Sequence, residues 1–437
     1  MADSSERQGA LLLLALLSCV VGTAIGLIVA VFRIALQSAD RWRDAWIARA
    51  HGWPIAGLLV TVAAVTALTA AATWLVQRLA PEAAGSGIPR VEAVGKGELT
   101  PAPFRVLPVK FIGGWFAIGG GLALGREGPS VQMGALLGSH LATIFRLTEA
   151  DSIALLAAGG GAGLAVAFNA PIAGAVFVLE ELIRRFDTRI CIAALGASCC
   201  AIAIARMFLG SAPDFNVTTL PDSGLGSGVL FFALGALAGL AGVTYNAAVL
   251  GVLKIGVCIH RRPELRAALI GAIVGMLAWF APALVGGGEP ITQRTLAGAE
   301  PIALLPLFFG IRFALGPLSY AAGTPGGLFA PMLVLGAQLG VLFATVCHFV
   351  LPHARVSPAA FAVVGMAAFF TAVVRSPVTG IVLVVELTAG FTQLIPMLWA
   401  SFAAMLIPTI LGNMPIYDSL SQPGFLRHRG QQSPHGS

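Results

Sequence analysis

Glu127 is the residue of this chain whose type and surroundings most directly suggest chemistry. It lies in a Gly-Arg-Glu-Gly-Pro segment, with no Asp, Glu, Lys or Arg from Phe111 to Gly125 or from Gly128 to Phe145. A carboxylate at membrane depth is costly and usually faces a cavity or an ion path. An ion pair with the adjacent Arg126 is the structural alternative, but neighbouring residues point in different directions. Glu127 is therefore the first candidate for a functional site.

The composition places this carboxylate in a membrane protein. The chain has 437 residues, of which 57% are hydrophobic and 11% charged, and its mean hydropathy is +0.88. Soluble domains carry roughly 25% charged residues. The net charge of +6 is spread over short clusters, which indicates interfacial anchors and loops rather than a nucleic-acid-binding surface. The six cysteines lie in apolar stretches without metal-ligand spacing, so we expect no metal and no cofactor.

The elements that position Glu127 are long apolar stretches interrupted by glycine and proline. Uncharged stretches cover residues 8–32, 50–77, 223–253, 267–288, 313–354 and 387–417. Several exceed the roughly 20 residues that cross a bilayer once. The stretch 313–354 contains Gly-Thr-Pro-Gly-Gly at 323–327. Irregular backbone at this depth is tolerated only where protein or a watery cavity satisfies it, which indicates a transporter or channel.

An internal repeat supports this interpretation. Two pairs of segments match in their spacing: Pro129, Gly134 and Gly138 with Pro331, Gly336 and Gly340, and Pro171, Gly174 and Glu180 with Pro377, Gly380 and Glu386. Both pairs are separated by a little over 200 residues. We therefore expect two homologous membrane halves, residues 10–210 and 223–420, joined by a linker at 211–222. A cytoplasmic segment at 1–9 and a polar tail at 421–437 would flank them.

Three motifs in these halves place glycine before a proline that a helix can accept. They occupy residues 85–89, 125–129 and 326–331. Because proline is favoured in the first helical turn, each motif is predicted to start a half-helix with unsatisfied N–H groups and a positive dipole end. Several such ends that converge would attract an anion. A buried lysine or arginine would hold the anion too tightly for fast release, so the motifs favour anion transport.

The same motifs resemble those of the CLC family of chloride channels and chloride/proton antiporters. The family's GSGIP, G(K/R)EGP and GxFxP stretches occur in order at residues 85–89, 125–129 and 327–331, and the similarity covers about residues 10–420. The resemblance implies an all-α integral membrane protein of tilted, partly broken helices in two inverted-topology repeats. It also implies a multi-pass homodimer of the inner (plasma) membrane that moves chloride and protons and is not an enzyme.

The resemblance assigns roles to individual residues. The Ser86 hydroxyl, the Tyr417 phenol and the backbone N–H groups of Leu328 and Phe329 would form the central anion site. Glu127 would be the external gate and Glu181 the internal proton-transfer residue, with Arg126, Gly128 and Glu180 in support. Chloride is favoured because Ser86 stands where nitrate-preferring relatives carry proline. Other halides and nitrate are expected to permeate as well.

Each of these assignments has a structural alternative. Ser86 is also a favourable helix N-cap, and Tyr417 also suits an aromatic belt at the membrane interface. Glu181 would equally mark where a helix reaches water, because Arg184 and Arg185 follow within one turn. Glu180 is either structural or a support of the proton path. We also expect Glu386 to be a structural hydrogen-bonding group and Arg312 a buried structural charge.

Three functions are compatible with these residues to different degrees. Chloride/proton exchange is favoured because Glu127 and Glu181 provide two proton stations. A passive voltage- or pH-gated chloride channel is the alternative, although channels of the family typically lack a carboxylate at the position of Glu181. A membrane-embedded hydrolase using Ser86 would need a base, and His140, the only histidine between residues 52 and 259, has no triad context.

Overall fold

The computed structural model describes residues 2–217, 228–259, 262–351 and 357–422. In these residues the regular structure is helical, and the first half contains α1 (Ala2–Ala50), α2 (Pro54–Leu79), α3 (Ile88–Gly95), α4 (Val106–Gly119), α5 (Glu127–Ile144), α6 (Glu149–Phe168), α7 (Pro171–Phe177) and α8 (Thr188–Leu209). The second half contains α9 (Gly228–Ile259), α10 (Pro263–Phe280), α11 (Glu289–Leu296), α12 (Leu305–Ala321), α13 (Phe329–Val350), α14 (Pro358–Val374), α15 (Pro377–Thr388), α16 (Leu394–Ile410) and α17 (Ile416–Ser421).

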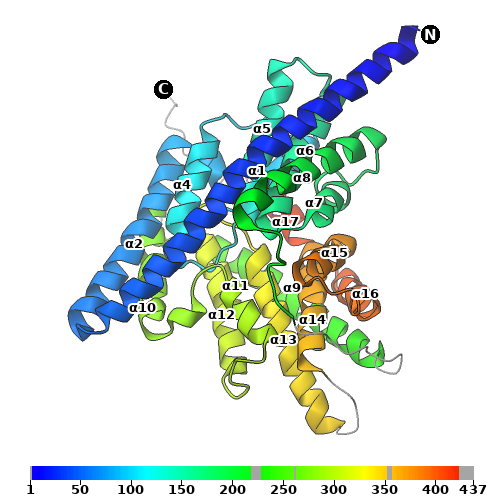
Figure 1. Ribbon diagram of the computed structural model, residues 1–437. Coiled ribbons are helices and arrows are strands. Elements are labelled where there is room, and N and C mark those ends of the chain that lie inside the picture. The colour runs from blue at the N-terminus through cyan, green and yellow to red at the C-terminus, as the bar shows by residue number, and fades with distance from the viewer. Residues whose placement is uncertain (1, 218–227, 260–261, 352–356, 423–437) are drawn as a thin grey trace.

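Seven of these helices are long and apolar enough to cross a membrane, namely α1, α2, α6, α8, α9, α10 and α13. Shorter apolar helices, such as α4 and α12, pack between them. Helix α1 runs diagonally along the molecule in Figure 1, and the helix continues to Ala50, well beyond the uncharged stretch 8–32. The prediction of a multi-pass all-α membrane protein is confirmed.

Proline begins many of these helices. Pro54, Pro171, Pro263, Pro358 and Pro377 each occupy the first residue of their helix. At this position the missing N–H costs no hydrogen bond, and the fixed φ angle of proline suits the helix. The sequence therefore fixes many starting points in a chain that is apolar almost throughout.

Glycines let the helices of each half pack closely, and they do so in matching places. A Cβ atom added at Gly134 of α5 would collide with the carbonyl oxygen of Gly159 in α6. One added at Gly336 of α13 would collide with the carbonyl oxygen of Gly365 in α14. Small residues allow backbones in membranes to approach in this way. The α5–α6 and α13–α14 pairs are thus built alike, as the repeat predicts.

Helices α7 and α15 show that the two halves are inverted relative to each other. Glu180, just beyond α7, accepts hydrogen bonds from the backbone N–H groups of Val378 (3.0 Å) and Thr379 (2.6 Å) at the start of α15. Glu386 of α15 accepts the equivalent bonds from the N–H groups of Ile172 and Ala173 at the start of α7. Because each carboxylate caps the other helix, the pair has an approximate two-fold relation. The expected structural role of Glu386 agrees with these bonds.

The boundaries of the halves stay predictions. Helix α8 ends at Leu209 and α9 begins at Gly228, so the linker falls between them, although residues 218–222 lie outside the described residues. Within the predicted N-terminal segment 1–9, residues 2–9 form the first part of α1. Of the polar tail only residues 421 and 422 are described.

Candidate functional site

Backbone hydrogen bonds bring the three glycine–proline motifs together. The Gly85 N–H donates to the Thr324 carbonyl (3.0 Å), and the Gly326 N–H donates to the Gly85 carbonyl (3.1 Å). Gly125 and Gly327 exchange two bonds of 2.8 Å. Helices α3, α5 and α13 start at these junctions, and none has a side-chain cap on its first turn. The predicted convergence of half-helices is therefore present, with their N–H groups turned toward one region.

Ser86 lies at the centre of this arrangement and is fully buried. The glycines on both sides of it have positive φ angles of 66° and 84°, a backbone shape that favours glycine. The N–H group of Ile88 reaches the Ser86 hydroxyl oxygen only at 3.5 Å, and the N-cap of α3 is Gly87. Capping by Ser86 is thus weak, so its hydroxyl keeps capacity for another partner.

Gly128 joins Ser86 to the start of α5. A Cβ atom at Gly128 would lie 2.5 Å from the Ser86 hydroxyl oxygen and 2.7 Å from the Ser86 carbonyl oxygen. Only glycine permits this approach, because real Cβ atoms do not come so close. Gly128 thus allows the start of α5 to pack directly on Ser86, and its supporting role in transport stays a prediction.

Tyr417, the first-turn neighbour of Ile416 in α17, is fully buried. Its ring stacks on that of Phe329 at a centroid distance of 5.8 Å. This burial rules out a place in an interfacial aromatic belt. The Tyr417 hydroxyl has no hydrogen-bond partner among the described residues, although Ser86 and Tyr320 lie nearby. A buried hydroxyl that lacks a partner calls for an explanation, such as a bound ion or water.

Leu328 and Phe329 begin α13 and are both buried. Leu328 is the N-cap residue and Phe329 the first helical residue, so their N–H groups belong to the unsatisfied set at this helix start. Phe329 stacks on Tyr417, and Gly327, just before Leu328, lies against Gly128, the residue that packs on Ser86. The four residues assigned to the anion site thus lie at or close to the first residues of α3, α13 and α17, and packing contacts link these helix starts.

Glu127 is the first residue of α5 and is fully buried. Its carboxylate folds back over Gly125, where a Cβ atom would collide with it. It points toward its own N–H group and that of Ala330, yet neither oxygen has a partner at hydrogen-bond distance among the described residues. This carboxylate thus faces the starts of α5 and α13 without being bonded in place.

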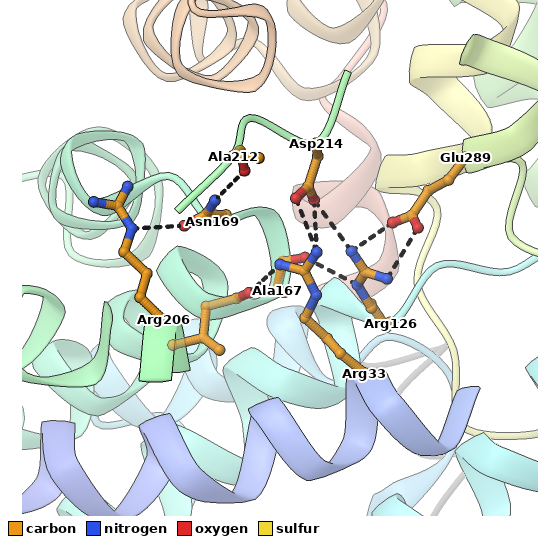
Figure 2. Close-up of polar contacts among 9 residues, drawn as sticks. Arg33, Arg126, Ala167, Asn169, Arg206, Ala212, Asp214 and Glu289 are labelled. Atoms are coloured by element: carbon orange, nitrogen blue, oxygen red, sulfur yellow. Dashed lines mark hydrogen bonds and ion pairs between the residues drawn. The ribbon is translucent and has the colours of Figure 1, made fainter. Parts of the chain in front are cut away.

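Arg126 does not neutralise Glu127. Its Nε donates to the Ala167 carbonyl (2.9 Å), and its two Nη atoms hold Glu289 at 3.0 and 2.5 Å. A further contact of 3.3 Å joins it to Asp214. Figure 2 shows Asp214 between the guanidinium groups of Arg33 and Arg126, with Glu289 on the other side of Arg126. Among the described residues the ion pairs of Arg126 are with Glu289 and Asp214, so the contacts favour a free Glu127 carboxylate over the ion-pair alternative.

A small cavity of about 40 Å³ lies against Glu127. Its lining includes Gly125, Glu127 and Ala330 together with Asp40 and Glu289. The side chains of Asp40 and Glu289 are each 35% exposed, so the cavity leads from the buried carboxylate toward solvent. Glu127 therefore borders this cavity, while the next residue, Gly128, packs against Ser86.

Glu181 lies in a short π-helical turn after α7 and is buried, in contrast to a residue that only marks the end of a helix. The Ser376 hydroxyl donates to one of its oxygens at 2.6 Å. Arg184 contacts the other oxygen at 3.4 Å and also pairs with Asp418 at 2.9 Å. Arg184 does contact Glu181, as the alternative of a helix end at the water surface assumed. The burial of Glu181 and its bond from Ser376 show, however, that it is not a surface residue.

Glu180, beside Glu181, faces a different partner. Both of its oxygens accept backbone bonds from the start of α15, and one also accepts the Thr379 hydroxyl at 2.7 Å. A carboxylate whose acceptors are this well satisfied is suited to holding two helices together. The contacts favour the structural role over a support of the proton path.

The structure adds residues that the sequence did not identify. Asp214 and Glu289 are the partners of Arg126, and they follow it by 88 and 163 positions, so no local pattern reveals them. Glu92 is buried close to Glu181, and Lys110 donates from its buried Nζ to the Ala83 and Gly85 carbonyls. An isolated charge in an apolar stretch, the signal that identified Glu127, would have identified Lys110.

Arg312 is buried, as expected, and its partners are backbone groups. Its guanidinium donates to the carbonyls of Leu284 (3.1 Å) and Gly286 (2.9 Å), and it reaches that of Gly287 at 3.5 Å. It holds the turn that precedes α11 and thereby fixes the position of Glu289.

Known proteins resemble this chain over nearly its whole length. The family model described as voltage gated chloride channel matches residues 68–409. The H(+)/Cl(−) exchange transporter ClcA of Vibrio parahaemolyticus is 37% identical over 414 residues, which are 93% of this chain and 88% of that protein. The ClcA of Salmonella typhimurium is 36% identical over 95% of this chain and 89% of that protein.

A solved structure agrees with the fold. The crystal structure of a slow cyanobacterial Cl−/H+ antiporter superposes with a TM-score of 0.90 at 33% identity, covering 96% of this chain and 98% of that one. The range of the family match, residues 68–409, spans the three motifs that meet around Ser86. The chain therefore belongs to the voltage-gated chloride channel (CLC) family.

Proposed function

We propose that this protein exchanges chloride for protons across the membrane, with Glu127 as a gate that competes with the anion. The observation that carries the proposal is the Glu127 carboxylate, which is buried at the starts of α5 and α13 without a hydrogen-bond or ion-pair partner. A carboxylate there occupies the kind of place that helix N-termini offer to an anion. When protonated it loses that attraction and can leave.

The anion site beside this gate consists of neutral donors. We assign the hydroxyls of Ser86 and Tyr417 and the N–H groups of Leu328 and Phe329 to it. The Tyr417 hydroxyl, buried without a partner, supports this assignment most directly. Neutral dipoles bind an anion less tightly than a buried cation would, so release stays fast. Chloride, with other halides and nitrate, is the proposed cargo.

Glu181 is proposed as the internal proton station. It is buried, and the Tyr417 hydroxyl lies within electrostatic range of both Glu127 and Glu181. Ser376 orients it, and Arg184 links it to the half-exposed surface. A proton that enters there and leaves through Glu127 would use a route that differs from the anion path at its inner end. A passive channel needs no such second carboxylate.

The relatives support the same choice. The proteins from Vibrio parahaemolyticus and Salmonella typhimurium carry the name H(+)/Cl(−) exchange transporter, and the solved relative is titled a Cl−/H+ antiporter. The homodimeric state and the location in the inner membrane implied by the resemblance belong to this proposal too. Mass measurement of the protein in detergent would test the dimer.

The test is a flux experiment on purified protein in liposomes. An outward chloride gradient should drive proton uptake by the natural protein, and the reversal potential should depend on both ions. Glu127→Gln should reduce proton movement to the level of protein-free liposomes, because the amide carries no proton, while chloride flux continues. Proton uptake that survives in E127Q would refute the gate. A natural protein whose reversal potential follows chloride alone would be a channel.

A further inference from the structure

The donor groups of Arg126 are used almost completely by residues other than its neighbour Glu127. Nε binds the Ala167 carbonyl, while Nη1 and Nη2 hold the two oxygens of Glu289, as Figure 2 shows. This two-point contact is the strongest geometry between a guanidinium and a carboxylate. Asp214 adds a single longer contact of 3.3 Å to Nη2.

Of the two acids, Glu289 decides where the guanidinium lies. Asp214 is 12% exposed, and both of its oxygens also accept from Arg33 at 2.9 Å. It therefore cannot offer Arg126 a second two-point contact without losing Arg33. Among the described residues Glu289 pairs with no basic group other than Arg126, and its place at the first residue of α11 is fixed by the turn that Arg312 holds.

We propose that Glu289 is a positioning residue for the external gate: it holds the Arg126 guanidinium off the Glu127 carboxylate. This inference rests on the proposed function of Glu127. Without Glu289, two donors of a buried guanidinium lose their acceptor, which is unfavourable. The adjacent Glu127 carboxylate, whose two oxygens have no partner, is the group that can replace it. The gate would then be trapped in an ion pair that the structure avoids.

Replacing Glu289 with a neutral residue also removes one negative charge from the cavity beside Glu127. The control must therefore remove a charge from the same cavity without changing a contact of Arg126. The charged groups nearest to Arg126 and Glu127 come from three elements: Arg33 and Asp40 from α1, Asp214 from the segment after α8, and Glu289 from α11. Asp40 lines the same cavity as Glu289 and is equally exposed, but among the described residues its ion-pair partner is Arg43 and not Arg126. Asp40→Asn is therefore the matched control.

The experiment compares Glu289→Gln with D40N in liposome flux assays at a series of external pH values. If Glu289 positions Arg126, E289Q should slow coupled transport by about tenfold near neutral pH and move the pH profile about one unit toward acid, because an ion-paired gate is harder to protonate. D40N should change the rate by no more than about threefold, as expected for a solvent-screened charge. Equal effects of E289Q and D40N would overturn the inference.

The same pair of changes in the E127Q background separates this inference from the proposed function. With the gate neutral, E289Q should slow chloride flux no more than D40N does. If E289Q still slows it tenfold there, Glu289 acts on the anion and not through the gate, and the inference fails. Proton transport by E127Q alone would instead refute the gate. Glu289→Asp, which keeps the charge but shortens its reach, permits the same comparison if E289Q does not fold, with an effect again larger than that of D40N.

Discussion

The two halves of this protein share a backbone plan, but of three matched positions that carry a carboxylate in the first half, they differ at two. Counted from matching prolines, Glu180 corresponds to Glu386, whereas Glu127 corresponds to Phe329 and Glu181 to Leu387. The shared pair caps α15 and α7 reciprocally. The two carboxylates that occur in the first half alone are both buried and face the region around Tyr417.

The presence of Glu127 and Glu181 in only one half distinguishes structural from functional carboxylates in a repeated fold. A group that both halves need for packing persists in both, because the same helix start must be satisfied twice. A group that acts on a single central pathway is needed only once. In the second half the corresponding positions carry apolar side chains, and Phe329 there packs against Tyr417. The asymmetry of Glu127 and Glu181 therefore supports roles beyond folding.

The largest effect that would test this comparison is expected from Glu181→Gln. The amide can keep the bond from Ser376 but cannot carry a proton, so proton transport should fall to background in liposomes while chloride flux stays within about threefold of the natural rate. Proton uptake and chloride efflux measured on the same preparation would show the separation.

The control for this change is Glu386→Gln, the same chemical change at a carboxylate that both halves share. Its coupling of protons to chloride should equal that of the natural protein. If E181Q still moved protons against their gradient, the internal station would lie elsewhere, and the buried Glu92 beside it would be the next residue to replace.

A smaller effect is expected from Ser376→Ala. Ser376 precedes Pro377 and bonds Glu181, whereas the matching residue before Pro171 is Ala170. A hydrogen bond to a charged group contributes about 1.5–3 kcal/mol. Its loss should lower the proton flux by about tenfold and leave chloride flux intact, because Glu181 lies off the proposed anion path. Rates measured at matched protein density would check both fluxes.

Thr379→Val provides the comparison for this serine. Thr379 donates its hydroxyl to Glu180, which keeps two backbone donors without it. The variant should therefore couple normally. Equal proton rates for S376A and T379V would show that the Ser376 bond does not serve proton transfer.

The sequence predicted those parts of the site that depend on local pattern. The glycine–proline motifs predict where α3, α5 and α13 begin. Glu127 is identified because it lies in a long apolar stretch that is otherwise nearly free of charged residues. The sequence alone could not predict the partners of Arg126 or the hydrogen bond from Ser376 to Glu181, because these contacts join residues that are 88 to 195 positions apart. The burial of Tyr417 was equally out of reach, since α17 is short and its partner Phe329 belongs to another helix start.

The smallest effects should come from Glu180→Gln and E386Q, which complete the comparison of the halves. Each change weakens a carboxylate that accepts two N–H groups at a helix start, so each should lower stability by about 1 kcal/mol, the usual value of such a cap. Thermal unfolding of the two variants in the same detergent would measure this. Because the caps are reciprocal, similar losses are expected, and strongly unequal ones would break the two-fold relation. Flux measurements on the same two variants give a second result. If proton transport falls in E180Q but not in E386Q, Glu180 serves the proton path in addition to holding α15. Normal coupling in both would leave Glu127 and Glu181 as the functional pair, the two carboxylates that have no counterpart in the other half.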